Sequence, residues 1–315
     1  MRRGPLGMGV TAVRRRIRFG LLASRADTGA EWRELARKAE DQGYSTLFVA
    51  DHFGKQLAPL PAVMAAAAVT TQLKVGTFVL DNDFRHPAAL AKEAATVQML
   101  TNGRFEFGIG AGWNEADYTT TGLPFDRPGV RVSRLEEALT IMQTFFAGEP
   151  VTFSGQFYRV DGLEAVPKAK PKILIGANGK RMLRLAARFA DIINFPDRPP
   201  VGISMGGNRG LGVSFAEQLQ TVREASGERY EQIELSVLCI PRITDDVSTT
   251  LETLAAQMRT TVQIVEEMPS ALVGSAEAIV GKLQRNRDEF DLSYPVINVG
   301  AIDAMQPVVR RLAGT

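Results

Sequence analysis

Short apolar runs alternate with longer amphipathic stretches from residue 17 to the end of the chain. The runs are apolar nearly throughout, as residues 46–50 (TLFVA) illustrate, and this is typical of parallel strands that are covered on both faces. The stretches between the runs carry apolar residues at helical spacing. A repeated strand–helix unit of this kind predicts a parallel sheet with right-handed crossover connections.

The number of these units indicates the fold class. Strands are expected at residues 17–22, 46–50, 73–80, 104–110, 172–175, 191–195, 234–240 and 294–299. Helices are expected at residues 31–42, 61–70, 87–100, 130–146, 180–189, 214–226 and 275–290, with a short helix at the end of the chain. Residues 151–160 alternate in polarity around Ser154-Gly155-Gln156, which predicts a small hairpin insertion. Eight strands with their helices fit an α/β fold, the (β/α)8 TIM barrel.

An open, doubly wound sheet is the alternative fold. Such a sheet would show G-x-G-x-x-G after its first strand, whereas residues 22–25 read Leu-Ala-Ser-Arg. We interpret residues 17–315 as one barrel domain, and residues 1–16 as a flexible, basic leader, because disorder concentrates at termini. A basic arm that contacts nucleic acid or membrane is the alternative for the leader. Residues 196–212 are rich in Pro and Gly and are expected to form either a lid over the site or a plain flexible loop.

Composition narrows the class of protein. The net charge of +2 is too close to balance to suggest a nucleic-acid-binding protein. The single cysteine, Cys239, rules out an internal disulfide and favours a reducing compartment, the cytoplasm. With two histidines beside it, a Cys/His zinc site is nearly excluded and no metal site is assigned, although carboxylate sites for Mg²⁺ stay open. No apolar run is long enough for a signal peptide or a membrane span.

The active site of a TIM barrel lies at the carboxyl ends of its strands, which selects the candidate residues. The second strand is followed by Asp51 and His52. His52 can act there as a general acid or base near neutral pH; the alternative is a structural histidine held by a neighbouring carboxylate. His86 precedes the proline that opens the third helix, and it is interpreted as a cap or loop residue.

Two further strand ends have the composition of a ligand site. Gly108, Gly110 and Gly112 alternate along the fourth strand and its loop, a pattern that lets a planar ligand approach the backbone. Trp113 offers a flat wall to a substrate, and Asn114 can donate and accept hydrogen bonds. A tight Gly-rich turn is the alternative.

The fifth strand leads into small residues and then a helix start, a pattern typical of an anion site. Free N–H groups and the helix dipole both favour phosphate there; ordinary loop chemistry is the alternative. The residues are Gly176, Ala177, Asn178, Gly179 and Lys180. The sequence carries no P-loop or EF-hand pattern. A redox cofactor that brings its own chemistry therefore fits this sparse set of side chains.

Four segments carry a family resemblance: ADH (50–52), GTFVLDNDFRHPAALAKEAATVQML (76–100), NGRFEFGIGAGWNEADY (102–118) and ILIGANGKRMLRLAARFADIIN (173–194). Their order and spacing resemble the bacterial-luciferase-like superfamily, and most closely its branch of oxidoreductases that depend on the deazaflavin coenzyme F420. The resemblance runs from about residue 17 to residue 299. It implies a TIM barrel with an insertion, a homodimer, and a cofactor across the strand ends. An FMN-dependent monooxygenase that uses O₂ is the first alternative, and a barrel that binds a cofactor without catalysis is the second.

The resemblance also implies roles for individual residues. Near the reactive ring it places Asp51 and His52, and at a third-strand bulge, often with a non-proline cis peptide, it places Thr77, Phe78 and Val79. The cofactor wall would be Gly110, Ala111, Gly112 and Asn114, and the phosphate turn Gly176, Ala177, Asn178, Gly179 and Lys180. Hydride would pass between the deazaflavin and a small organic substrate stacked near Trp113, while His52 exchanges the substrate proton. The sugar-phosphate dehydrogenases of the family carry Glu where this chain has Trp113, which argues against a glucose-6-phosphate-type substrate.

Overall fold

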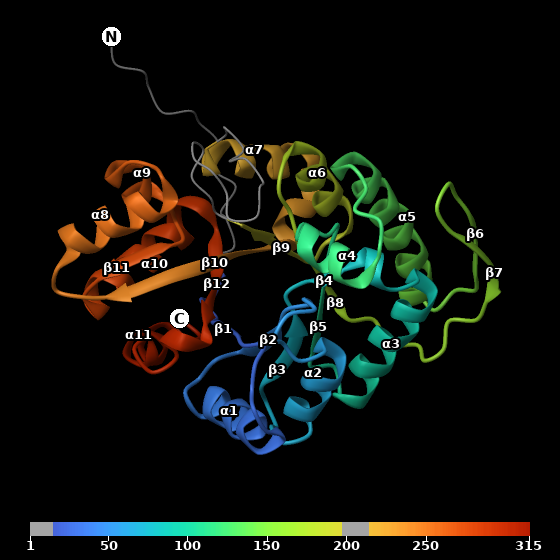
Figure 1. Ribbon diagram of the computed structural model, residues 1–315, viewed down its shortest axis with the longest axis horizontal. Coiled ribbons are helices and arrows are strands. Elements are labelled where there is room, and N and C mark those ends of the chain that lie inside the picture. The colour runs from blue at the N-terminus through green and yellow to red at the C-terminus, as the bar shows by residue number, and fades with distance from the viewer. Residues whose placement is uncertain (1–14, 197–213) are drawn as a thin grey trace, which may run out of the picture.

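Parallel strands pair in sequence order until the sheet closes on itself. The computed structural model describes residues 15–196 and 214–315. The ring consists of β1 (Gly20–Leu22), β2 (Thr46–Val49), β3 (Lys74–Thr77), β5 (Phe105–Gly110), β8 (Lys172–Gly176), β9 (Ile192–Phe195), β10 (Glu234–Ile243) and β12 (Leu292–Asn298). β9 pairs with β10, and β12 returns to pair with β1, which closes the barrel (Figure 1). The predicted (β/α)8 barrel is confirmed, and the open sheet is wrong.

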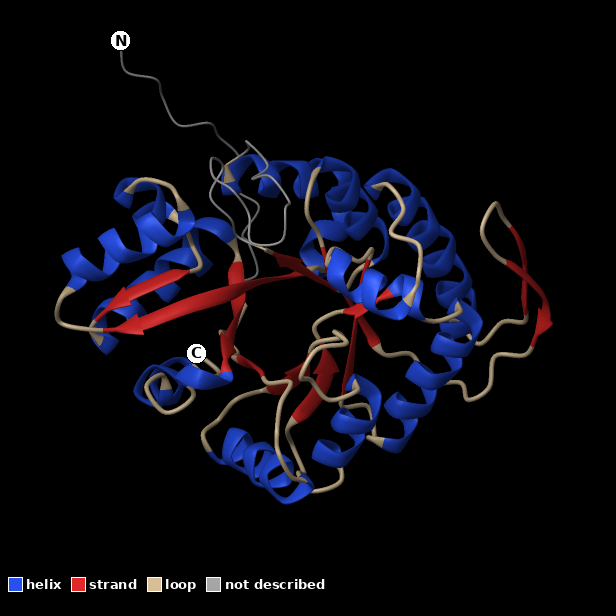
Figure 2. Cartoon of the chain, in the orientation of Figure 1, coloured by secondary structure: helices blue, strands red, loops and turns tan. Residues whose placement is uncertain are grey.

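Helices surround the ring of strands (Figure 2). They are α1 (Gly29–Asp41), α2 (Pro59–Ala67), α3 (Pro87–Leu100), α5 (Pro128–Phe146), α6 (Lys180–Phe189), α7 (Phe215–Ser226), α10 (Ala276–Phe290) and α11 (Gln306–Leu312). Capping residues set several starts: Ser214 and Glu217 form a capping box at α7, and the Ser275 side chain accepts from the Ala278 N–H at α10. Proline opens α2, α3 and α5, since its missing N–H costs nothing in the first turn.

Apolar side chains fill the barrel interior. Phe48, Leu174, Ile192, Tyr294 and Val296 form an inner cluster, while a larger core lies between strands and helices. The barrel is therefore packed and is not a pore, as TIM barrels are in general. No helix within residues 15–196 and 214–315 is long and apolar enough to cross a membrane.

A polar cluster closes the amino-terminal end of the barrel. The Arg18 guanidinium donates to both carboxylate oxygens of Glu234, at 2.7 and 2.6 Å, and to Oε1 of Glu106, at 2.7 Å. The Tyr294 hydroxyl donates to the other oxygen of Glu106 at 2.8 Å, and Arg18 lies 3.5 Å from the centre of the Tyr294 ring. Glu106 is 1% exposed, so its charge depends on these partners.

Additions to the eight-unit plan lie outside the ring. The predicted hairpin insertion is confirmed as β6 (Val151–Ser154) and β7 (Arg159–Leu163), which pair antiparallel. The third strand is broken: β3 ends at Thr77, and β4 (Leu80–Asp81) continues beside β5. A short helix that the sequence analysis missed, α4 (Glu115–Thr121), follows β5. Short 3₁₀ helices lie at Asn82–Phe84, Gly227–Gln232 and Val299–Ala301.

A second missed region forms an outer unit on the seventh strand. Residues 241–274, for which no element was predicted, form the end of β10, α8 (Val247–Met258), α9 (Val262–Glu267) and β11 (Ala271–Gly274). β10 pairs with β12 as far as Cys239 and then with β11 from Ile240 onward. The outer unit has a small core of its own, made of Leu251, Leu254, Ala255, Val265, Met268 and Ala271.

Two sequence expectations fall largely outside the described residues. The basic leader of residues 1–16 is described only at Arg15 and Arg16, and the Arg15 guanidinium donates to the Glu231 carbonyl oxygen. The expected lid or flexible loop covers residues 196–212, of which only Pro196 is described.

Candidate active site at the barrel mouth

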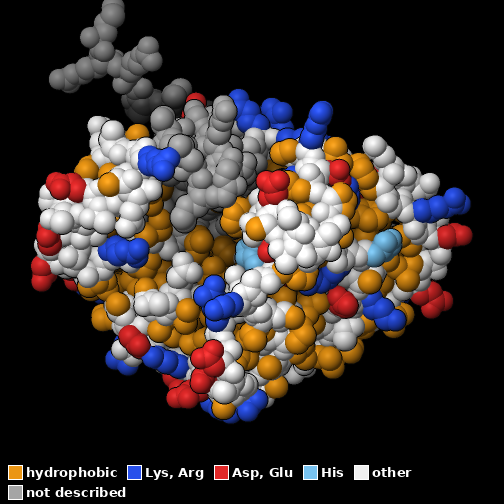
Figure 3. Space-filling model, viewed as in Figure 1, with side chains coloured by type: hydrophobic (Ala, Val, Ile, Leu, Met, Phe, Trp, Pro, Cys, Tyr) orange, Lys and Arg blue, Asp and Glu red, His pale blue; other side chains and the backbone are white. Residues whose placement is uncertain are grey.

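The floor of the mouth is apolar. Leu22, Phe78, Val79 and Leu238 are partly buried and pack on the inner cluster from the carboxyl ends of their strands. Hydrophobic side chains fill the hollow at the centre of this face (Figure 3). The Phe78–Val79 peptide bond is cis, as the family resemblance implied. The floor therefore has the apolar character that a planar ring system needs on one face.

Glycines of the fourth strand accommodate its neighbour in the sheet. A Cβ on Gly108 would lie 1.9 Å from the Thr77 carbonyl oxygen, and one on Gly110 would lie 2.9 Å from a Val79 methyl group. Thr77 is fully buried, and its hydroxyl both donates to and accepts from the Gly108 backbone. The interpretation that these glycines admit a ligand is therefore incorrect for Gly108, and Thr77 positions the bulge and is not exposed at the mouth.

The loop after β5 is held tightly. Gly112 has φ +73°, and a Cβ there would lie 2.1 Å from the Tyr118 hydroxyl and 2.3 Å from Oδ2 of Asp81, so only glycine fits. Arg131 is 5% exposed and donates to the carbonyl oxygen of Ala111 at 3.2 Å. The expected wall residues Gly110, Ala111 and Gly112 thus form a fixed edge of the mouth.

A buried carboxyl group, Asp81, lies under this loop. The Tyr118 hydroxyl donates to Oδ2 of Asp81 at 2.8 Å, and the Asp83 N–H donates to Oδ1 at 2.9 Å. Burial raises the pKa of Asp81 to about 6, against the effect of both hydrogen bonds. The folded protein therefore retains a proton on Asp81 at pH values where the unfolded chain has released it.

Asp81→Asn should change how stability depends on pH. Because the folded pKa of Asp81 is raised, its favourable contribution is complete below the unfolded pKa and is lost as pH rises through about 6. We expect the free energy of unfolding of the variant, relative to wild type, to rise by about 3 kcal/mol between roughly pH 4 and pH 7. Urea unfolding at both pH values measures this difference. Asp161→Asn, at an exposed position, is the control, and its difference in unfolding free energy from wild type should not change with pH. A difference for Asp81→Asn that is also independent of pH would contradict the raised pKa of Asp81.

Asp51 is committed to contacts within the protein. Its carboxylate accepts two hydrogen bonds from Arg85, at 2.6 and 3.1 Å, and one from the Asp81 N–H at 3.1 Å. Asp51 is 7% exposed. Asp51 thus joins β4 to Arg85 beside the mouth, and its contact with a cofactor stays a prediction.

His52 is the titratable side chain most directly available at the mouth. Its Nδ1 lies 2.6 Å from Oδ2 of Asp117, and its ring meets the Trp113 ring edge to face at 5.5 Å. The side chain of His52 is 25% exposed, and Trp113 is 41% exposed. A neighbouring carboxylate that holds His52 was one alternative from the sequence, and the structure identifies it as Asp117. The one signal in the sequence for Asp117 is its acidic side chain soon after the Gly-rich loop.

His86 lies elsewhere and has another role. Its Nδ1 accepts a hydrogen bond from the Ala88 N–H at 3.2 Å, which caps α3 as the sequence suggested. Its ring packs edge to face against Tyr158. The two histidines thus separate into one at the mouth and one at a helix start.

The predicted phosphate turn joins β8 to α6. Gly179 precedes α6 with φ +83°, and no side chain caps the helix. Asn178 Oδ1 is buried without a hydrogen-bond partner among the described residues, and Lys180 is exposed. Ala177 is buried, and its N–H donates to the Asn194 carbonyl. The turn brings together an uncapped helix start, a cation and one unsatisfied polar atom.

Arg181, which follows the predicted phosphate turn, is engaged within the protein. Arg181 donates to the Gly129 carbonyl oxygen and to the Ser133 hydroxyl, both at 2.8 Å, and so joins α6 to α5. Within the described ranges no group of three His, Cys, Asp or Glu side chains could hold a metal ion.

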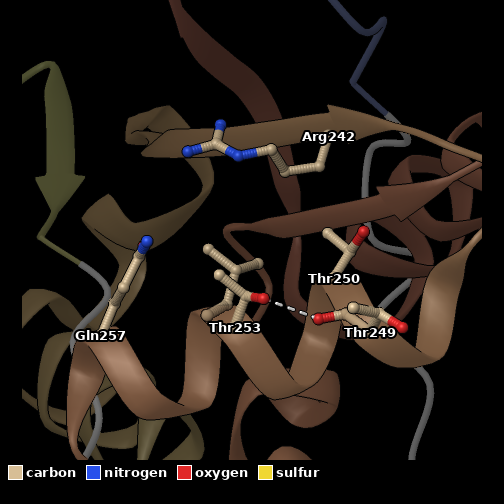
Figure 4. A pocket seen from close by; sticks show the side chains of 6 residues that line it. Arg242, Thr249, Thr250, Thr253 and Gln257 are labelled. Carbon is tan, nitrogen blue, oxygen red and sulfur yellow. Dashed lines mark hydrogen bonds between the residues drawn. The ribbon is translucent and has the colours of Figure 1, made fainter.

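A separate hollow of about 150 Å³ lies on the outer unit (Figure 4). Arg242 extends over it from β10, while Thr250, Thr253 and Gln257 face it from α8. The Arg242 guanidinium donates to the carbonyl oxygen of its neighbour Pro241. The hollow contains none of the strand-end residues of the mouth, so the mouth remains the candidate active site.

Comparison with known proteins gives one family. A family model described as luciferase-like monooxygenase matches residues 13–209. The F420-dependent glucose-6-phosphate dehydrogenase of Nakamurella multipartita is 35% identical over 186 residues, 56% of this chain and 55% of that protein. The FMNH(2)-dependent dimethylsulfone monooxygenase of Pseudomonas fluorescens is 30% identical over 185 residues, 55% of this chain and 50% of that protein. The chain thus spans about half the length of these curated relatives.

Solved structures share the fold over nearly the whole chain. The coenzyme F420-dependent tetrahydromethanopterin reductase from Methanopyrus kandleri superposes with a TM-score of 0.74. The match covers 95% of this chain and 100% of that chain, at 17% sequence identity. At this identity the likeness concerns the barrel alone.

Proposed function

Because the chain belongs to the luciferase-like monooxygenase family, we propose that it is an F420-dependent oxidoreductase that acts on a small organic substrate. The observation that carries the proposal is the mouth itself. An apolar floor at Phe78 and Val79 lies beside Gly176, where a polar turn leads into α6. The relative from Nakamurella multipartita, named for F420, supports this cofactor.

Two features of the mouth fit a flavin-type group. A Cβ added to Gly176 would be in ordinary van der Waals contact with the Val79 methyl groups alone, at 3.5 and 3.7 Å, so this glycine adjoins the apolar floor without crowding it. Asn178 Oδ1 is buried and unpaired among the described residues, and a ligand hydroxyl or N–H would satisfy it. The floor at Phe78 and Val79 would support the ring, and the start of α6 with Lys180 would take the phosphate.

The side chains at the mouth divide the remaining work. The bound deazaflavin would supply or accept the hydride. Nδ1 of His52 is engaged by Asp117, so Nε2 is the nitrogen that takes the substrate proton or returns it. Trp113 gives the substrate a flat wall beside this ring. The pair of Asp51 and Arg85 holds the adjoining loop in place.

Assembly, location and substrate class are part of the same proposal. We propose a homodimer in the cytoplasm, with no nucleic-acid or membrane partner, that acts on a substrate other than a sugar phosphate. The apolar character of Trp113 and Phe78 supports the substrate class, and the near-neutral net charge supports the absence of a nucleic-acid partner. Sedimentation of the purified chain tests the dimer.

An FMN-dependent monooxygenase is the second candidate, because the relative from Pseudomonas fluorescens is named for FMNH(2). Fluorescence titration of the purified protein with F420 and with FMN, in parallel at moderate salt, separates the two. We expect tight F420 binding and weak FMN binding. The reverse result moves the chain to the monooxygenases, and binding without turnover of any reducible substrate favours a non-catalytic barrel.

Gly176→Leu is the matched test of the mouth in the same titration. The longer side chain would extend past the Val79 methyl groups into the proposed ring site, so we expect cofactor affinity to fall by tenfold or more, which corresponds to about 1.4 kcal/mol. Gly281→Leu, on the outer helix α10, is the control and should bind normally. Normal cofactor binding by Gly176→Leu would show that the cofactor lies elsewhere.

A further inference from the structure

We propose that Asp117 is a positioning residue that holds His52 in a single tautomer, so that the two side chains act as one unit at the mouth. The inference rests on the proposed function at one point, which is that His52 exchanges a proton with the substrate. Asp117 lies in the first turn of α4, and His52 follows β2, so the contact joins the loop after β2 to a helix 65 residues further along the chain.

Asp117 is itself fixed by hydrogen bonds from several directions. Oδ2 accepts from the Asn114 side-chain amide at 2.8 Å and lies 2.6 Å from Nδ1 of His52. Oδ1 accepts from the Phe53 N–H at 3.0 Å. Burial raises the pKa of Asp117, but the hydrogen bonds from His52, Phe53 and Asn114 outweigh burial and keep the pKa below its ordinary value. The side chain therefore stays an acceptor-only carboxylate at neutral pH.

A carboxylate with no proton to give determines which ring nitrogen of His52 carries one. Nδ1 must be the donor at 2.6 Å, so the proton of the neutral ring sits on Nδ1 and the lone pair sits on Nε2. When Nε2 takes up a second proton, the charge on Asp117 stabilises the resulting cation. Asp117 thus favours both forms that a proton exchange at Nε2 requires.

His86 provides the opposite case within the same chain. Its Nδ1 accepts from the Ala88 N–H, so the neutral ring of His86 must carry its proton on Nε2. The chain contains only these two histidines. The two rings are therefore expected in opposite tautomers.

Among the described residues, the acidic neighbours of His52 in its own loop and in α4 are paired or exposed. Asp51, the preceding residue, is neutralised by Arg85. Glu115 lies in the same turn of α4 as Asp117 but is exposed. Asp117 is thus the carboxylate in contact with the ring, and Glu115 offers a matched control.

Nuclear magnetic resonance of the apo protein, labelled with ¹⁵N-histidine, tests the tautomers without any cofactor. At a pH where both rings are neutral, we expect two spin systems, one protonated at Nδ1 (His52) and one at Nε2 (His86). His52→Gln assigns them by removing the first. In Asp117→Asn the Nδ1–H signature should give way to a mixture, while His86 and the Glu115→Gln control stay unchanged. Two rings both protonated at Nε2 in wild type would overturn the proposal.

Steady-state kinetics separate positioning from plain structural support. Asp117→Asn keeps the shape of the side chain and removes its charge, so we expect kcat to fall by about 10–100-fold. Cofactor affinity and the KM for the substrate should be kept, because Asp117 contacts His52 and not the proposed cofactor turn. An unchanged kcat, or a loss of cofactor affinity as large as the loss of kcat, would overturn the proposal. If the wild-type protein binds neither F420 nor FMN, the proposed function is wrong. The tautomer of His52, measured on the apo protein, is not affected by that outcome.

Discussion

His52→Ala is expected to lower kcat by about 10²–10⁴-fold, the usual range for removing a general acid or base. The ring of His52 lies at the mouth against Trp113 and carries its unengaged nitrogen there, and alanine leaves no group to exchange the substrate proton. Cofactor affinity should be unchanged, because the residues proposed to hold the cofactor lie between β3 and β4 and in the turn from β8 to α6. Steady-state kinetics with the cofactor chosen by titration, together with that titration itself, measures both quantities.

His86→Ala is the control for this substitution. It removes the same side chain from a helix cap, at a cost of about 1 kcal/mol of stability, and should leave turnover intact. Full turnover in His52→Ala would remove His52 from the mechanism. A loss of cofactor binding in that variant would instead make His52 part of the binding site.

Arg18→Met should destabilise the fold by about 3–5 kcal/mol, because removing one partner of a buried ion pair leaves the other charge uncompensated. Glu106 is 1% exposed and would keep only Tyr294 and the more distant Lys74 as partners. Urea unfolding near neutral pH measures the loss. Arg311→Met removes an arginine from an exposed pair with Glu277, whose side chains are 55% and 71% exposed, and should leave the unfolding midpoint unchanged.

The pH dependence of this loss identifies its cause. In wild type, burial raises the pKa of Glu106, but the charges of Arg18 and Lys74 outweigh burial and hold the pKa below its ordinary value. Wild type therefore loses this contribution as pH falls through the folded pKa of Glu106. In Arg18→Met burial dominates, and the variant should recover stability as Glu106 takes up a proton. A deficit that stays constant on acidification would show that lost packing, and not the buried charge, is responsible.

The barrel could be predicted from the sequence because its strands are short, buried on both faces and separated by helices with clear starts. The helices at Pro87–Leu100 and Lys180–Phe189 begin and end where the sequence predicted. Residues 241–274 were missed because α8 is rich in Ser and Thr on its exposed side and its small apolar face packs on residues outside the repeating unit.

The strand end at which each candidate residue lies could be predicted from the sequence, whereas the contacts between these residues could not. Placing His52 at the mouth needs only the barrel rule, whereas its partner Asp117 is distant in sequence and becomes visible only in three dimensions. Gly108 shows the same limit: a sequence pattern indicates a close approach, but the atom that approaches is the Thr77 carbonyl of the neighbouring strand. Asp51 was expected to face the cofactor, and the structure shows that Arg85 uses both of its oxygens.

β10 belongs both to the barrel and to the outer unit, and each of these parts has a hydrophobic core of its own. Its first residues pair with β9 and β12 inside the ring, and its last residues, from Ile240 onward, pair with β11 alone. Contacts within the outer unit draw on its own small core. The outer unit also packs on α10, where the Asn286 side chain donates to the Pro269 carbonyl oxygen at 2.8 Å, and Leu272 of β11 joins the larger core. Substitutions confined to the small core of α8 and α9 should therefore loosen this unit before they disturb the ring.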